Sequence, residues 1–234
     1  MKRSTPKKTN YNFKALFDTL ATAEAADVST YHGPRGNSKL GEIPAFNLLP
    51  GCSCSPEARA HCMIEGCYAV KNVFSHGYNV NANTVLKAWT DNTVLAKRHV
   101  YTLETQIESY LNQNRPQFFR IHSAGDFISV KYARMWYRIA KRHSETRFLA
   151  FTKQWDIIRH VFFYRIPNFE LVLSGWIGIS IPEDLRRHYR CAWCDDGIED
   201  RIPANAIECP GSCDACGMCW HLSELGRDTK FHKH

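Results

Sequence analysis

In the stretch IPAFNLLPGCSCSPEARAHCMIEGCYA, residues 43–69, a short apolar run leads directly into a loop that carries four cysteines. The run over 43–49 stops at Pro50-Gly51, which predicts a buried strand ending in a loop. A loop that follows such a strand lies at the carboxyl edge of a sheet, where α/β proteins place their chemistry. We therefore expect an α/β protein whose first strand leads into a functional loop.

The cysteines of this loop are predicted to bind a metal. They are Cys52, Cys54, Cys62 and Cys67, four thiols within sixteen residues. Thiolates this close in sequence converge on zinc or on an iron–sulfur cluster. Three ligands from Cys54, Cys62 and Cys67 would leave one iron of a [4Fe–4S] cluster open, whereas a site that also uses Cys52 would be closed and structural.

A disulfide is the alternative for these thiols. The basic N-terminus, MKRSTPKKTNYNF, has no apolar stretch behind it and does not read as a secretory signal. We therefore expect a cytoplasmic protein with reduced cysteines, which favours metal binding over disulfides.

Outside the cysteine loop, helical and strand patterns alternate. Helical periodicity is expected over 13–26, 80–99, 103–111, 129–143 and 155–163. Strands are expected over 117–123, 147–152 and 170–175, with 176–181 as a further candidate. This alternation predicts a parallel sheet. A chain of 234 residues is short for a closed eight-stranded barrel, which usually needs about 250, so we expect a partial (βα) barrel.

Three regions are expected along the chain. Residues 1–35 form a basic arm and a helix, residues 36–185 the partial barrel, and residues 186–234 a small cysteine-rich module that binds metal. The module holds Cys191, Cys194, Cys209, Cys213, Cys216 and Cys219, with His221 two residues further on. The pair Cys191-x-x-Cys194 is predicted to form a chelating knuckle. Zinc held by this pair and two later thiols, or a [4Fe–4S] cluster on the last four, both fit the spacing.

The segment FFRIHSAGDF, residues 118–127, is the third candidate. Gly125 permits a tight turn at a strand end, and Asp126 could hydrogen-bond a ligand or, alternatively, cap the helix that starts near Ser129. Arg120 and His122 are two residues apart, so we expect them to share a face of the sheet. Smaller candidates with packing roles as the alternative are Tyr68, Lys153, Ser174 and Trp176.

The net charge and the hydropathy of the chain limit the kinds of partner that it could bind. The net charge is +7 and the pI is about 8.9, which suits a polyanionic partner or simply a basic surface. Basic residues alternate with aromatic ones in KYARMWYRIAKRH, residues 131–143, which favours nucleic acid. No apolar run approaches the roughly 18 residues of a membrane span, so no membrane partner is expected.

Several motifs together resemble a known family. NSKLG, CSCSPEARAHCMIEGCYA, FRIHSAGDF, RFLAFTK and CPGSCDACGMCW occur in this order between about residues 36 and 222. This set resembles a phage family known as the "gene product eighty-eight" type. The family has no secure activity, so the resemblance alone implies no function.

A more distant resemblance is to radical SAM enzymes, which are partial (βα) barrels. It implies that Cys54, Cys62 and Cys67 hold a [4Fe–4S] cluster and that Gly125 and Asp126 contact S-adenosylmethionine, with Arg120 and His122 nearby. Tyr68 and Lys153 would complete the cofactor site, and the C-terminal cysteines would hold zinc or a second cluster. The expected function is modification of a nucleotide or nucleic acid. Here the cysteine spacing is longer than in that family, and Asp126 replaces its usual glutamate.

Two other functions stay open. The chain is also similar to phage DNA 7-deazaguanine transglycosylases, which are barrels with a catalytic aspartate and a C-terminal zinc site. That resemblance would make Asp126 the nucleophile and would place zinc within 209–221. A non-catalytic, zinc-stabilised protein that binds nucleic acid is the remaining alternative.

Overall fold

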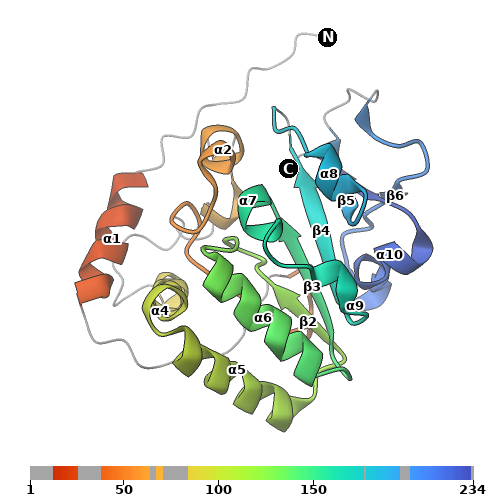
Figure 1. The fold of residues 1–234 in the computed structure, drawn as a ribbon. Coiled ribbons are helices and arrows are strands. Elements are labelled where there is room, and N and C mark those ends of the chain that lie inside the picture. The colour runs from red at the N-terminus through yellow and green to blue at the C-terminus, as the bar shows by residue number, and fades with distance from the viewer. Residues whose placement is uncertain are drawn as a thin grey trace.

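In the computed structural model, the described residues are 13–25, 38–63, 67–70, 84–176, 178–195 and 201–232. They form one sheet of seven strands with helices packed against both of its faces (Figure 1). The strands are β1 (Ala45–Phe46), β2 (Phe118–Ile121), β3 (Arg147–Thr152), β4 (Phe169–Gly175), β5 (Arg190–Asp195), β6 (Ile207–Glu208) and β7 (Thr229–His232).

All six strand pairs are parallel, so the predicted parallel α/β architecture is confirmed. The strand order is β1-β2-β3-β4-β5-β7-β6, which follows the chain through β5. A doubly wound sheet reverses its order at a switch point, whereas a (βα) barrel adds strands in sequence. Barrel closure is not observed, because β1 and β6 are the two outermost of the described strands.

The helices are listed with the bounds that the structure gives them. They are α1 (Phe13–Ala25), α2 (Pro56–Ala58), the π-helix η1 (Arg59–Met63), α4 (Thr84–Arg98), α5 (Val100–Asn114), α6 (Val130–Arg142), α7 (Trp155–Ile158), the 3₁₀ helix η2 (Phe163–Arg165), α8 (Glu183–Arg186), α9 (Cys213–Cys216), the 3₁₀ helix η4 (Met218–Trp220) and α10 (Leu222–Leu225).

Helices α5 and α6 lie along one face of the sheet, called the helix face (Figure 1). Helix α6 starts at Ser129, whose side chain accepts a hydrogen bond from the backbone N–H of Tyr132. Its apolar residues recur at helical spacing, and Tyr132, Met135 and Trp136 are completely buried. They pack on sheet residues such as Phe119, so the main core lies between α6 and the sheet.

The opposite face, called the C-terminal face, carries Leu149 and Val172 at the centre of the sheet. Trp220 and Leu222 from the last part of the chain cover it. The separate module expected over 186–234 is not observed, because β5 pairs with β4 and β7 continues the same sheet. The strand pattern within this cysteine-rich region escaped the sequence interpretation.

A smaller apolar cluster supports the cysteine loop. Leu16 and Leu20 of α1 pack with Trp89 of α4 and with Leu49, which precedes the loop. The loop is thus anchored on two helices at the carboxyl end of β1.

Two expected strands are shorter or absent. Strand β1 spans only Ala45–Phe46, because the Leu48 N–H donates to the carbonyl of Ala124, in the loop after β2, at 3.0 Å. Over 176–181 the described residues form a single antiparallel bridge, between Trp176 and Ile179. Within the described part of the chain, no helix is long and apolar enough to cross a membrane.

Candidate metal centre and the carboxyl edge of the sheet

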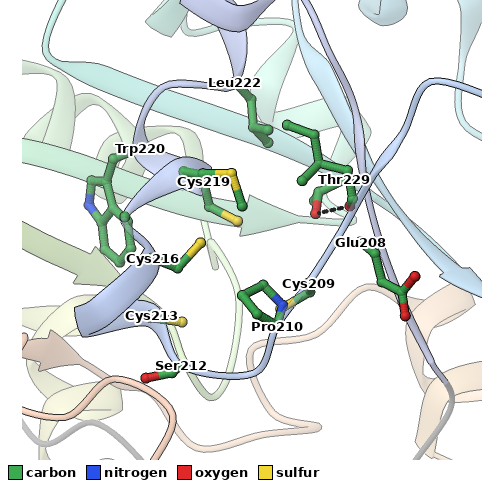
Figure 2. Close-up of a pocket in the computed structure, with 13 residues that line it drawn as sticks. Glu208, Cys209, Pro210, Ser212, Cys213, Cys216, Cys219, Trp220, Leu222 and Thr229 are labelled. Carbon is green, nitrogen blue, oxygen red and sulfur yellow. Dashed lines mark hydrogen bonds between the residues drawn. The ribbon is translucent and has the colours of Figure 1, made fainter.

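Four cysteines line one pocket on the C-terminal face. Cys209, Cys213, Cys216 and Cys219 form its wall with Trp220, and we call it the thiol pocket. The sulfur atoms of Cys213 and Cys216 point toward the segment of Cys209 and Pro210 (Figure 2). The last four cysteines therefore line one pocket, and the metal expected for them stays a prediction.

Local backbone contacts hold the pocket walls. The Cys213 N–H donates to the carbonyl of Lys39 at 2.6 Å, and the Cys209 N–H donates to the carbonyl of Lys230 in β7 at 2.8 Å. Gly217 ends α9 with a left-handed φ of 63°, which turns the chain back toward Cys219. Residues distant in sequence thus fix the four thiols in one place.

Burial is the main electrostatic influence on these thiols. It raises the pKa of Cys219 to about 12 and also raises the pKa of Cys213, while the positive charge of Arg120 opposes both shifts. Protonated thiols are poor metal ligands, so metal binding would release protons here. Across the described ranges, no three or more His, Cys, Asp or Glu side chains are arranged to hold a metal ion.

The prediction that Cys191 and Cys194 chelate one metal together is wrong. Both residues lie in β5, and residues three apart on a strand point to opposite faces. Cys191 packs in the core of the helix face. The pair therefore cannot direct both sulfurs to one ion. His221 lies outside the pocket lining, and its ring nitrogen Nδ1 is 2.9 Å from Glu224 Oε2.

The N-terminal cysteine loop sits over the carboxyl edge of the sheet. Burial raises the pKa of Cys52 to about 11, and its Sγ lies 3.9 Å from the carbonyl oxygen of Leu16. Cys54 Sγ accepts a hydrogen bond from Gly51 N–H at 3.3 Å. Cys67 packs at the margin of the α1–α4 cluster. The side chain of Cys62 lies outside the described part of the structure.

Ser53 ties this loop to the two next strands, and the sequence interpretation missed it. Its Oγ accepts the N–H of Asp126 at 3.1 Å, and its carbonyl accepts Gln154 Nε2 at 2.9 Å. Gly125 has a φ of +85°, and an added Cβ would lie 2.7 Å from Ser53 Oγ. The cysteine loop and the Gly125 turn therefore fit against each other only with glycine at this position.

The carboxylate of Asp126 is buried and bridges the ends of β2 and β3. Oδ1 accepts Phe127 N–H at 2.8 Å and Thr152 Oγ1 at 2.7 Å, and Oδ2 accepts Lys153 N–H at 2.8 Å. Burial raises its pKa to about 6 against these hydrogen bonds. Asp126 does not cap α6, because Ser129 is the N-terminal capping residue of that helix. Three donors on a carboxylate that is 5% exposed favour a positioning role over a nucleophilic one.

Arg120 and His122 do not share a face, contrary to the expectation from their spacing. His122 has a φ of +61°, so the strand alternation ends before it and its ring turns to the helix face. There its Nε2 is 2.8 Å from Tyr132 Oη, and its ring contacts Phe127. Burial and, to a lesser degree, Arg120 lower the pKa of His122 to about 3, so the imidazole is neutral.

Lys153, Ser174 and Trp176 do come together at the ends of β3 and β4. Lys153 Nζ donates to Ser174 Oγ at 2.8 Å and lies 5.7 Å from the centre of the Trp176 ring. Tyr68, which is 45% exposed, donates its hydroxyl to the carbonyl of Ser123. These residues place a cation, a hydroxyl and aromatic surface at the carboxyl edge.

The basic and aromatic stretch 131–143 is divided between the core and the surface of α6. Tyr132 and Trp136 are core residues, and Arg138 and Arg142 form ion pairs with Glu104. The helical period thus places Tyr132 and Trp136 inward and sets Arg138 and Arg142 against α5, so these four residues are occupied within the fold.

Comparison with known proteins places the chain in a family. The model of the family described as "Gene product 88" matches residues 14–222. The chain belongs to the Gene product 88 family. The match includes β1 to β6, the cysteine loop and the four cysteines of the thiol pocket, so the phage-family resemblance expected from the motifs is confirmed.

Two curated relatives of this Gene product 88 protein are phage proteins. The "Gene 88 protein" of Mycobacterium phage L5 is 27% identical over 150 residues, and that of Mycobacterium phage D29 is 26% identical over 150 residues. Each match covers 60% of this chain and 60% of the relative, so the chain matches under two thirds of their length. No solved structure matches.

We expect Asp126→Ala to lower the free energy of unfolding of this Gene product 88 protein by about 2 kcal/mol, because buried donors would lose their acceptor. Denaturant unfolding at pH 7 measures this loss. Thr152→Ser keeps the hydroxyl that donates to the carboxylate and accepts the N–H of Gln154 at 3.0 Å, and it loses only a methyl group, so it should cost about 1 kcal/mol. Equal losses in the two variants would contradict the bridging role of Asp126.

Proposed function

We propose that the protein is an iron–sulfur enzyme of the radical-SAM-like type that acts on a nucleotide or nucleic acid. In this proposal the thiol pocket holds one cluster, and the carboxyl edge of the sheet is the catalytic side. The observation that carries it is the pocket itself, where Cys209, Cys213, Cys216 and Cys219 form one wall of thiols.

The number of these thiols matches the ligand set of a [4Fe–4S] cluster as well as that of a zinc ion. Tetrahedral zinc with Zn–S bonds of about 2.3 Å requires its sulfurs to lie roughly 3.8 Å from one another. The described thiols line one pocket, yet no group of three or more is arranged to hold one ion. In a [4Fe–4S] cluster each thiolate binds a different iron, so the thiolates lie further apart. Four thiols that line one pocket supply the ligand number of a [4Fe–4S] cluster.

The position of the N-terminal loop supports a catalytic role for the carboxyl edge. Ser53 holds the loop on Asp126 and Gln154, so Cys54 and Cys67 belong to the same edge as the ends of β2 and β3. When bound there, a [4Fe–4S] cluster with an open iron supplies one-electron chemistry to S-adenosylmethionine. The chain's part is to hold the loop through Ser53 and to fix the backbone of Lys153 through Asp126.

The side chains at this edge support a nucleotide or nucleic acid as the substrate class. Lys153 offers a positive charge to a phosphate, and the ring of Trp176 offers a surface on which a base can stack. The net charge of +7 favours attraction of a polyanion. A nucleotide or a nucleic-acid strand supplies both a phosphate and a base.

Metal analysis tests the proposal. We expect protein purified without oxygen, and reconstituted with iron and sulfide, to contain both elements and to absorb broadly in the visible range. The double variant Cys213→Ser/Cys216→Ser should lose about half of the iron if the N-terminal loop also holds a cluster, and nearly all of it otherwise. Cys191→Ala is the matched control, since that buried thiol lies outside the pocket and should leave the iron content unchanged.

Zinc without iron in the reconstituted wild type would contradict the iron–sulfur assignment. Equal iron in the wild type and the double variant would remove the thiol pocket as the cluster site.

A further inference from the structure

Arg120 occupies the C-terminal face of β2 and has no carboxylate partner within the described ranges. Its neighbours on the strand, Phe119 and Ile121, point to the core of the helix face, so the arginine side chain points the other way. The residue is partly buried on β2, which lies between β1 and β3. Long charged side chains in such places are normally paired, so this one calls for a counter-charge.

The guanidinium is held in place by an aromatic ring, but its Nε makes no hydrogen bond among the described residues. It lies 4.0 Å from the centre of the Phe151 ring, on the adjacent strand β3. Its Nε is buried and has no hydrogen-bond partner among the described residues. The ring contact fixes the group, while a buried donor without an acceptor costs free energy unless something negative approaches it.

The thiol pocket lies beside this guanidinium. Phe118, two residues before Arg120 on the same face, packs its ring 5.1 Å from that of Trp220 in the pocket wall. Cys213 and Cys219 pack in the same apolar cluster as Phe118 and Phe151, the residues that flank Arg120. The positive charge of Arg120 also acts on the thiols, because it lowers the pKa of Cys213 and Cys219 against the larger effect of burial.

We propose that Arg120 is the charge partner of a metal–thiolate centre in the thiol pocket, where it retains the centre and makes it easier to reduce. This inference rests on the proposed metal centre. Four thiolates around iron–sulfur or zinc carry a net negative charge that a partly buried site must offset. Net charge and hydrogen bonds around an iron–sulfur cluster set its reduction potential. Removal of one nearby positive charge should therefore favour the oxidised cluster.

The test compares Arg120→Met, Arg120→Lys and the wild type, with Arg138→Met as the matched control. Arg138 lies on α6, pairs with Glu104 and changes the net charge equally. Two quantities are measured on reconstituted protein: the rate of metal loss to a chelator and, for iron–sulfur protein, the midpoint potential in an optical redox titration. Circular dichroism and thermal unfolding establish that each variant is folded.

We expect Arg120→Met to lose metal about tenfold faster than the wild type and to have a more negative midpoint potential. Arg120→Lys keeps the charge and should lie close to the wild type in potential, and Arg138→Met should match the wild type in both measurements. If Arg120→Met does not fold, Arg120→Gln replaces it, with the same expectation.

The outcomes separate the two proposals. If Arg120→Met loses metal at the wild-type rate and has the wild-type midpoint potential, the role of Arg120 is overturned, while the proposal of a metal centre stands. Equal defects in Arg120→Lys and Arg120→Met would overturn the charge account. A wild type that holds neither iron nor zinc would overturn both proposals, and a zinc-only wild type tests Arg120 through metal loss alone.

Discussion

The Gly125→Ala variant is expected to be less stable than the wild type by about 4 kcal/mol, measured as the free energy of unfolding in urea. The backbone φ of +85° strains any residue with a Cβ, at a cost of roughly 1–3 kcal/mol. The new Cβ would also lie 2.8 Å from both Leu48 Cβ and the Leu48 carbonyl oxygen. Overpacking against such fixed atoms adds about 1–3 kcal/mol.

A substitution at Gly226 separates the cost of backbone strain from the cost of steric crowding. Gly226 has a φ of +63° and nothing within 4 Å of an added Cβ. Gly226→Ala should therefore cost only about 1 kcal/mol. Similar losses in the two variants would show that the close fit between the Gly125 turn and the cysteine loop contributes nothing to stability.

Acid should destabilise the wild type more than a His122→Asn variant, by up to about 5 kcal/mol at pH 3. Burial lowers the pKa of His122 from 6.5 to about 3 in the folded protein. The unfolded state therefore binds a proton first, and stability is lost as the pH falls from 6.5 toward 3. Asparagine is the suitable replacement, because it tolerates the positive φ of 61° at this position.

Protonation of Asp126 changes the stability in the opposite direction to protonation of His122. Its pKa rises from 3.8 to about 6, so the folded state binds the proton first and gains about 3 kcal/mol as the pH falls from 6 to 4. In the wild type this gain offsets much of the His122 loss. In His122→Asn the His122 loss is absent and the Asp126 gain remains, so the stability of this variant should rise over this interval relative to the wild type.

Urea unfolding at several pH values from 7 to 3.5 measures how the free energy of unfolding depends on pH. Comparison of the wild type with His122→Asn isolates the contribution of His122, and comparison with Asp126→Asn isolates that of Asp126. Parallel pH profiles for the wild type and His122→Asn would contradict a buried neutral imidazole.

The central part of the fold could be predicted from the sequence because local pattern and burial agree there. The strand expected over 147–152 matches β3, and the helix expected over 129–143 matches α6 within a residue at each end. In both, the apolar period reflects one buried face. The convergence of Cys209 to Cys219 followed likewise from their short spacing.

Other features depend on contacts that no local pattern contains. Strand β5 carries two cysteines, and chelating motifs and buried strands place cysteine at similar spacings. The opposite orientations of Arg120 and His122 depend on one positive φ. The role of Ser53 depends on partners 73 and 101 residues away.

The insertion of β7 between β5 and β6 has a consequence for biosynthesis. Strand β6 pairs only with β7 among the described strands, and the Cys209 N–H is held by Lys230. A growing chain folds from its N-terminus, so every pocket cysteine is made before the strand that fixes one wall of the pocket. Until residues 229–232 are translated, β6 and the Cys209 N–H lack their hydrogen-bond partners in β7. Assembly of the pocket, and any loading of it, must therefore follow translation of this final strand.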